Sequence, residues 1–282
     1  MHKDISPQQE QQTFSTIHTP YTHFLLDMWG VVHDGCNALP GAIHCLENLR
    51  AHDKKILFIS NSSRPGHNLE QLMNGMGIER GTHYDHIHSS GDAVIDGLND
   101  PENDFSGKDY YYLGDDTHAH PLLEHISGKR TLNLEQADYI LFTALVPTTD
   151  MVLEEALRLN KTLICANPDV VAIHGGKTGH CPGLAAQKYE KNGGIVIYYG
   201  KPYPPIYESS LKKLGNPPKE KVLAVGDGMH TDIKGANTMG LDVVLIHSGI
   251  HRDESRQSLE KTLKTQDINP TFIMDRFMWN KA

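Results

Sequence analysis

The sequence predicts an α/β protein: a doubly wound parallel sheet between two helical layers, with a second α/β unit inserted into it. Short apolar runs rich in β-branched residues recur along the chain, each ends in turn residues, and helix-like stretches separate them. Near-continuous apolar strands of this kind indicate a parallel sheet that is covered on both faces. A length of 282 residues is enough for one large domain or two moderate ones.

The main sheet is predicted from five apolar runs. In chain order they are 23–26, 56–59, 195–199, 222–225 and 243–246. After the second run, apolar residues recur at helical spacing and predict an amphipathic helix whose stripe packs on the core. These residues are Leu69, Leu72, Met73 and Met76.

The middle of the chain carries its own strands and helix. The predicted strands are 110–113, 139–142 and 163–166, and the predicted helix is 151–159. We therefore expect an inserted α/β cap domain over 91–190, flanked by segments whose Gly, Ser and Asn content is typical of hinges. The main domain would combine 21–90 with 191–282, after a polar N-terminal segment, 1–20.

The charge balance and the chain's beginning restrict the function classes. The sequence has 26 Lys and Arg against 35 Asp and Glu, a formal net charge of -9, which argues against binding nucleic acid or an anionic membrane by bulk charge. Segment 1–20 lacks a signal-peptide core, and the longest apolar runs are only strand-sized. We expect a soluble cytoplasmic protein whose four scattered cysteines are reduced.

Polar residues with useful chemistry follow four of the predicted strands. They are Asp27, Ser60, Lys201 and Asp227. Functional residues of an open parallel sheet gather beyond the carboxyl ends of its strands. Taken singly, each could be an ordinary turn or cap residue. Together they suit phosphoryl transfer, because a carboxylate can act as nucleophile, a pair of carboxylates can bind Mg²⁺, and a lysine adds positive charge.

Four segments resemble, in order, the motifs of the haloacid dehalogenase superfamily. They are 27–35, 58–62, 200–202 and 226–233. Two further segments, 166–169 and 181–183, resemble landmarks of the class IIA branch, which includes sugar-phosphate, nucleotide and pyridoxal-phosphate phosphatases. The resemblance extends from about Phe24 to Gly249 and implies a Rossmann-like core of three layers, α/β/α, with an inserted cap.

The resemblance also implies roles for individual residues. Asp27 would be the nucleophile and would bind Mg²⁺ together with Asp227 and the main-chain carbonyl of Trp29. Asp232 would orient a metal-bound water or Lys201 from outside the ligand set.

The remaining implied roles concern the substrate. Ser60, Asn61 and Lys201 would hold the phosphoryl oxygens, with Ser60 and Lys201 counted among the catalytic residues. Asn167 and Asp169 would contact the substrate from the cap, although Asn167-Pro168-Asp169 is equally well explained as a turn.

One position departs from the phosphatases of the family. They carry Asp two residues after the nucleophile, as general acid for the leaving group, and this sequence has Trp29 there. Asp34 is a candidate replacement, and His33 and His230 are further ones. An aromatic residue at this position also resembles the dehalogenases, which need neither leaving-group protonation nor a metal.

We therefore expect a Mg²⁺-dependent phosphatase that acts on a small phosphorylated metabolite, such as a sugar phosphate or a nucleotide, through an aspartyl phosphate on Asp27. The alternative is a catalytically weakened protein that binds or senses a phosphorylated ligand; a dehalogenase-like hydrolase is less favoured. The cap would close over the site. We expect no nucleic-acid or membrane partner, and a homodimer is possible by analogy with class IIA relatives.

Overall fold

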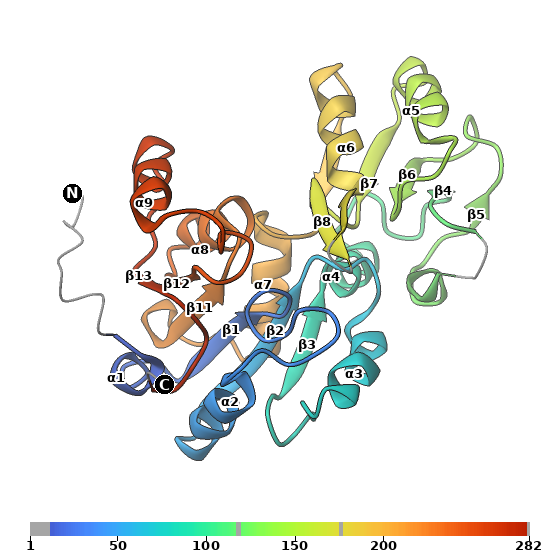
Figure 1. Ribbon diagram of the computed structural model, residues 1–282. Coiled ribbons are helices and arrows are strands. Elements are labelled where there is room, and N and C mark those ends of the chain that lie inside the picture. Colours follow the sequence, from blue (N-terminus) through green and yellow to red (C-terminus); the bar gives the residue numbers. More distant parts are fainter. Residues whose placement is uncertain (1–11, 117–119, 175–176, 281–282) are drawn as a thin grey trace. The chain divides into compact units, whose positions relative to one another are not determined.

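Six strands form the first sheet, in the order β13-β12-β11-β1-β2-β3 (Figure 1). The computed structural model describes residues 12–116, 120–174 and 177–280. The strands are β1 (His23–Asp27), β2 (Lys55–Ser60), β3 (His86–Ser89), β11 (Val222–Gly226), β12 (Asp242–Ile246) and β13 (Phe272–Met274). β1 pairs in parallel with β2 on one side and with β11 on the other. The predicted α/β class with a parallel sheet is confirmed.

Burial explains why β1 lies in the middle of this sheet. Phe24, Leu25 and Leu26 are fully buried, so both faces of the strand are covered. The associated helices are α1 (Phe14–Ile17), α2 (Ala42–Ala51), α3 (Gly66–Gly75), α7 (Pro204–Lys213), α8 (Lys234–Met239) and α9 (Arg256–Thr265). The predicted apolar stripe of α3 holds at Met73, which is fully buried, but is wrong at Leu72, which is exposed.

A second sheet has five strands in the order β10-β7-β6-β4-β5. They are β4 (Tyr110–Leu113), β5 (Arg130–Thr131), β6 (Tyr139–Phe142), β7 (Thr162–Cys165) and β10 (Val196–Tyr198). Helices α4 (Ser90–Leu98), α5 (Thr149–Arg158) and α6 (Pro182–Lys191) and the antiparallel pair β8 (Val171–His174) and β9 (Lys177–His180) belong to the same stretch of chain. β4, β6, β7, α5 and α6 bury one common apolar cluster, which includes Ile140, Phe142 and Leu163.

The third predicted strand is assigned to the wrong sheet. Residues 195–199 were expected in the first sheet, but β10 pairs in parallel with β7, Val196 opposite Leu163, and forms an edge of the second sheet. An apolar run specifies a buried strand but not its partner, because hydrogen bonds to either sheet satisfy the same backbone groups.

The chain divides into two compact units. Of the described residues, the first unit holds 12–59, 70–87 and 210–280, and the second unit holds 60–69 and those within 88–209. The predicted domain boundaries, at 90/91 and 190/191, stay a prediction.

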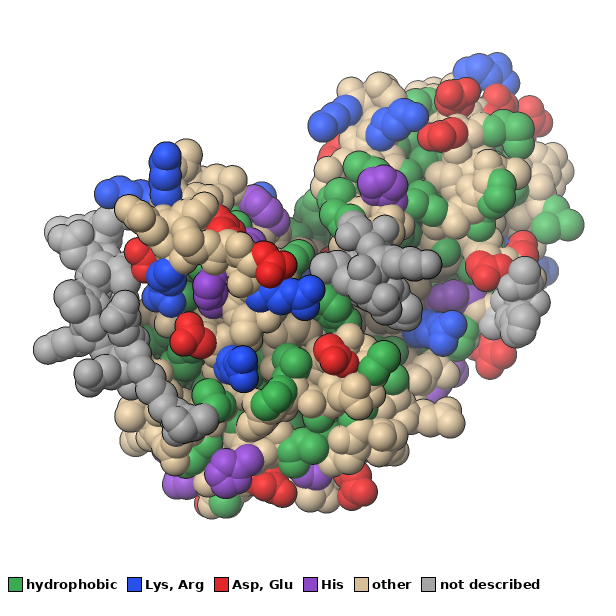
Figure 2. Space-filling view, in the orientation of Figure 1, with side chains coloured by type: hydrophobic (Ala, Val, Ile, Leu, Met, Phe, Trp, Pro, Cys, Tyr) green, Lys and Arg blue, Asp and Glu red, His purple; other side chains and the backbone are tan. Residues whose placement is uncertain are grey.

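Charged side chains of both signs are interspersed on the face shown in Figure 2. Within the described part of the chain, no helix has the length and apolar character needed to cross a bilayer.

Candidate active site

Three buried carboxylates meet at the carboxyl ends of two neighbouring strands of the first unit. Asp27 ends β1, Asp227 follows β11, and Asp232 lies in a π-helix, η4 (Met229–Ile233), that comes directly after. Their exposed fractions are 8%, 5% and 5%, and one oxygen of each lies within 4.8 Å of the others. We call this group the acid cluster. The structure thus brings together the two acids that the sequence places after distant strands.

The parallel register explains this meeting. Leu26 of β1 lies opposite Val225 of β11, so the two strands end at the same edge of the sheet. Like charges at this separation repel one another strongly in a buried site unless a cation or a proton neutralises them. Buried carboxylate oxygens are the ligands that Mg²⁺ prefers, so the donor set of the acid cluster fits a divalent cation.

The backbone fixes the position of Asp227. The Ile250 amide donates a hydrogen bond to Asp227 Oδ2 at 2.8 Å. Gly30 and Gly249 approach the same carboxylate so closely that a Cβ on either would overlap it. Gly30 also has a φ of +81°, which favours glycine. One oxygen of Asp227 is therefore held by main chain.

Asp232 is held in a comparable way. Its Oδ2 accepts hydrogen bonds from the Gly228 amide at 3.1 Å and from the Thr231 hydroxyl at 3.2 Å. π-helical turns are rare and are found mostly at functional sites. His230, a predicted candidate for proton transfer, is exposed in the same turn.

The loop after Asp27 contains the other candidates for proton transfer. Asp34 is exposed, and its Oδ1 accepts from the amides of Asn37 at 2.8 Å and Cys36 at 2.9 Å. These two backbone hydrogen bonds lower the pKa of Asp34. Because an acid with a lowered pKa is ionised at neutral pH, this geometry favours a turn role for Asp34 over a catalytic one.

His33 is the buried member of this loop. Its side chain is 4% exposed, and Nδ1 accepts from the Gly35 amide at 3.0 Å. Burial lowers the pKa of His33 to about 4, since desolvation disfavours the charged ring. Trp29 is half-buried, and its indole nitrogen lies against Gly35.

The second unit holds a different polar group, which we call the Asn61 group: Asn61, Asp169 and Lys201. The Asn61 amide nitrogen donates to Asp169 Oδ1 at 2.7 Å and to the Lys201 carbonyl at 3.1 Å. Its Oδ1 accepts from the Lys201 amide at 2.6 Å. Asn61 and Lys201 are buried. Both polar ends of the Asn61 side chain are therefore engaged within the protein.

Small residues allow this close packing. A Cβ on Gly200 would overlap Pro168 and crowd the Asn61 side chain, so only glycine fits before Lys201. Asn167 Oδ1 accepts from the Asp169 amide at 3.1 Å, which is the local turn that was the alternative to a substrate contact. Ser60, which follows the residue paired with Asp27, is half-buried, and its hydroxyl accepts from the Ser62 amide.

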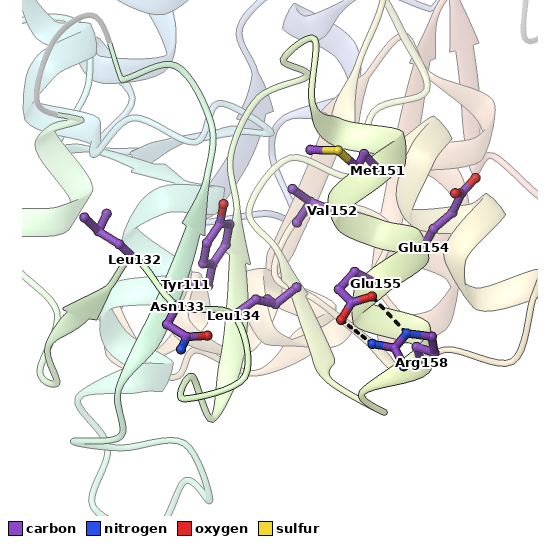
Figure 3. Close-up of a pocket in the computed structure, with 9 residues that line it drawn as sticks. All are labelled: Tyr111, Leu132, Asn133, Leu134, Met151, Val152, Glu154, Glu155 and Arg158. Carbon is purple, nitrogen blue, oxygen red and sulfur yellow. Dashed lines mark hydrogen bonds and ion pairs between the residues drawn. The ribbon is translucent and has the colours of Figure 1, made fainter.

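The second unit also has a groove of about 710 Å³ (Figure 3). Leu132 and Leu134 form one side and Met151 and Val152 of α5 the other, with Tyr111 between them. Its one drawn polar contact is the exposed pair of Glu155 and Arg158. The acids and the amide that line the groove, Glu154, Glu155 and Asn133, are exposed or half-buried. The acid cluster, whose three carboxylates are buried, is therefore the better candidate for chemistry.

Several groups that position the side chains of these two sites were not predicted from the sequence. They are the Ile250 amide, Gly249, Thr231 and the use of Asn61 as a hub. Gly249 after the strand 243–246 was a readable signal, because glycine often allows the backbone to approach another group.

Comparisons with known proteins agree with the geometry. Residues 24–125 match the family described as haloacid dehalogenase-like hydrolase, and residues 198–278 match one described as HAD-hydrolase-like. The chain belongs to the haloacid dehalogenase superfamily. The predicted class of enzyme, a hydrolase of this superfamily, is confirmed.

Individual relatives align over nearly the whole chain. An acid sugar phosphatase of Staphylococcus haemolyticus is 25% identical over 262 residues, covering 89% of this chain and 92% of the relative. A haloacid dehalogenase-like hydrolase of Brucella suis superposes with a TM-score of 0.79 at 27% identity, over 95% of this chain and 99% of that one. A possible sugar phosphatase of Cytophaga hutchinsonii gives 0.78 at 23% identity, over 96% and 99%.

Proposed function

We propose that this protein is a Mg²⁺-dependent phosphatase that hydrolyses a small phosphorylated metabolite, such as a sugar phosphate or a nucleotide, through an aspartyl phosphate on Asp27. The observation that carries the proposal is the acid cluster, three buried carboxylates with one oxygen each within 4.8 Å of the others. Such a cluster is costly unless a cation balances it. The names of the sugar phosphatase relatives support the substrate class.

In this proposal the acid cluster binds the metal and starts the reaction. Asp27 acts as nucleophile and ligand, Asp227 and the Trp29 carbonyl complete the protein ligands, and Asp232 orients the site from outside the ligand set. A bound Mg²⁺ would neutralise charge on the phosphoryl oxygens. Main-chain hydrogen bonds fix one oxygen of Asp227 and one of Asp232, which supports a preformed site for the cation.

The phosphoryl group itself would be held by Ser60, the backbone of Asn61 and Lys201. The Asn61 side chain is engaged with Asp169 and Lys201, so we assign it the positioning of Lys201. Asn167 and Asp169 are proposed substrate contacts.

The test is a panel of phosphorylated metabolites and p-nitrophenyl phosphate, assayed for phosphate release with Mg²⁺ and with chelator. Wild type should release phosphate only with Mg²⁺, and Asp27→Asn should lose turnover by about 10⁴-fold or more, because the covalent intermediate cannot form. Trapping by acid quench should show phosphate on wild type alone. Equal turnover by Asp27→Asn would refute the assignment, and chloride release from 2-chloro acids would indicate a dehalogenase instead.

A second function is favoured by one observation. Trp29 stands where the phosphatases carry a proton donor, and Asp34 is engaged in a turn. A protein with this loop could bind a phosphorylated ligand and turn it over poorly. Thermal stabilisation by phosphorylated metabolites without phosphate release from any compound of the panel would support the binding function over the enzymatic one.

A further inference from the structure

The loop of 28–39 follows the proposed nucleophile, Asp27, and contains two of the candidates for proton transfer, His33 and Asp34. A leaving alkoxide needs a proton as it departs, and a donor must lie within hydrogen-bond reach of it. After Asp27 this loop offers three titratable side chains: His33, Asp34 and Cys36. What each of them does in the structure determines whether the loop can supply that proton.

Asp34 is used by the turn itself. Its Oδ1 accepts from the amides of Cys36 and Asn37, at 2.9 and 2.8 Å, so the side chain caps its own turn on the exposed side of the loop. An ionised carboxylate accepts hydrogen bonds and donates none. Cys36 is exposed in the same turn. The turn therefore uses its acid as an acceptor.

His33 is the buried side chain of this loop, and Trp29 is half-buried. The Gly35 amide donates to His33 Nδ1 at 3.0 Å, and the His33 carbonyl accepts from the Gly30 amide at 2.8 Å. The Trp29 indole nitrogen lies against Gly35, which has a φ of +97°. An indole N–H donates a hydrogen bond but does not transfer its proton. The loop thus folds on itself around an aromatic side chain.

We propose that this enzyme is selective for phosphoryl compounds whose leaving group departs as a stable anion: phosphoric anhydrides, acyl phosphates and aryl phosphates. Phosphate esters of primary alcohols, which include many sugar phosphates, are poor substrates. This inference rests on the proposed function and narrows its substrate class.

The chemistry balances without a protein acid. A carboxylate oxygen of Asp27 attacks phosphorus, the bond from phosphorus to the leaving oxygen breaks, and the electron pair leaves with that oxygen as a phosphate, carboxylate or phenolate anion. Water then attacks the aspartyl phosphate, the phosphorus–oxygen bond to Asp27 breaks, and inorganic phosphate leaves. The proton lost by the water passes to solvent or to the phosphate. The Asp27 carboxylate is restored.

General acid catalysis contributes about 10²- to 10⁴-fold where a leaving group needs it. We therefore expect kcat/KM for an alkyl phosphate such as glycerol 3-phosphate to fall below that for acetyl phosphate or p-nitrophenyl phosphate by about that factor. A plot of log kcat/KM against leaving-group pKa for substituted phenyl phosphates should be steep. A good leaving group speeds the first step but not the hydrolysis of the aspartyl phosphate, so p-nitrophenyl phosphate should give a burst of p-nitrophenolate.

Two variants test the assignment at one position. Trp29→Asp introduces a carboxyl group, and Trp29→Asn introduces a group of the same shape that cannot transfer a proton. Trp29→Asp should raise the relative rate on glycerol 3-phosphate by about 10²-fold and flatten the plot, and Trp29→Asn should do neither. Circular dichroism and thermal unfolding verify that both variants fold. If neither folds, the plot for wild type remains decisive.

The outcomes separate this inference from the proposed function. A flat plot for wild type, with glycerol 3-phosphate turned over as fast as p-nitrophenyl phosphate, overturns the inference and leaves the phosphatase standing; another group would then supply the proton. No turnover of any compound, including acetyl phosphate, overturns both. The inference is also overturned if the plot of log kcat/KM against leaving-group pKa is steep for wild type and Trp29→Asp and Trp29→Asn change its slope equally. The shape of the side chain at position 29, rather than proton transfer, would then set the selectivity.

Discussion

The acid cluster of the first unit and the Asn61 group of the second unit are both buried and polar, but different parts of the chain hold them. Strand ends bring the carboxylates together, and main-chain amides and glycines then fix Asp227. In the Asn61 group a single side-chain amide connects Asp169 and Lys201, which lie 108 and 140 positions further along the chain.

This difference predicts which substitutions should disrupt each site. A site held by backbone keeps its shape when a carboxylate becomes an amide, but it cannot accommodate an added Cβ. A site held by one side chain loses its organisation when that side chain is removed, because each of its partners loses a hydrogen bond.

Asp227→Asn should separate metal binding from folding in the acid cluster. We expect the loss of Mg²⁺-dependent turnover by about 10³-fold or more, because one of the carboxylate ligands is gone. In chelator the variant should melt higher than wild type, because one of three neighbouring like charges is removed. Thermal unfolding with and without Mg²⁺ measures both effects. A lower melting temperature in chelator would show that the carboxylates are not mutually repulsive.

Asn61→Ala, in the second unit, should lower both the stability of the protein and its turnover. The Lys201 amide and carbonyl and the Asp169 carboxylate would lose a buried partner, which should lower the free energy of unfolding by about 2–4 kcal/mol. Turnover should fall by about 10²-fold, because Lys201 is no longer held in place. Denaturant unfolding and steady-state kinetics measure the two losses.

The matched control for this variant is Asn74→Ala, which removes an exposed amide from α3. It should change neither stability by more than about 0.5 kcal/mol nor turnover. If Asn61→Ala and Asn74→Ala change stability and turnover equally, the hydrogen bonds of Asn61 to Asp169 and Lys201 do not organise this group.

Gly249→Ala tests the backbone clamp on Asp227. The added Cβ would overlap the Asp227 carboxylate and displace it, and a shift of about 1 Å costs about 10²-fold in rate. Isothermal titration with Mg²⁺ should show weaker binding. Gly75→Ala is the control, because a Cβ there meets nothing within 4 Å. Unchanged Mg²⁺ affinity in Gly249→Ala would show that the backbone around Gly249 moves and that the Asp227 carboxylate keeps its position.

Sequence analysis predicted the acid cluster better than the Asn61 group for a physical reason. Asp27 and Asp227 each follow an apolar strand, and parallel strands end at one edge, so a local pattern contains the information. The link from Asn61 to Asp169 depends on tertiary packing, which no local pattern records. The amide of Ile250 was equally invisible, because every residue except proline carries one.

The strands, too, were only partly predictable from local sequence patterns. Apolar runs correctly predicted β1, β2, β11 and β12, but the run at 195–199 joined the second sheet, since apolarity does not name a strand's neighbour. Short or polar strands such as β3 and β13 were not predicted. Catalysis by Asp34 stays a prediction; its place beside Gly35 and Asn37 is also typical of a turn that an Asp side chain caps, which was the alternative interpretation of this position.

His33 should make folding stability depend on pH. Its pKa is about 4 in the folded protein and about 6.5 when unfolded, so between these values the unfolded chain binds more protons. The stability is fully present above pH 6.5 and is lost as the pH falls towards 4, by roughly 3 kcal/mol in total. Chemical unfolding between pH 4 and 7 measures this slope, and His33→Gln should flatten it.

The second unit provides a comparison. Burial also lowers the pKa of His120 to about 4, and the nearby charge of Arg64 adds to the effect. His120→Gln should therefore flatten the slope in the same pH window. His44→Gln is the control, because His44 is exposed on α2. A slope that His44→Gln reduces as much as His33→Gln would contradict the assignment to the buried ring.

Leu132→Ser, in the groove of the second unit, should have the smallest effect. Leu132 is 85% exposed, so its truncation removes little buried apolar area, and we expect a change in unfolding free energy below about 0.5 kcal/mol with turnover within about twofold. Light scattering on the same samples tests whether the predicted homodimer uses this face. A loss of turnover above about tenfold would show that the groove takes part in the reaction, and the contrast between a chemical acid cluster and a chemically inert groove would then fail.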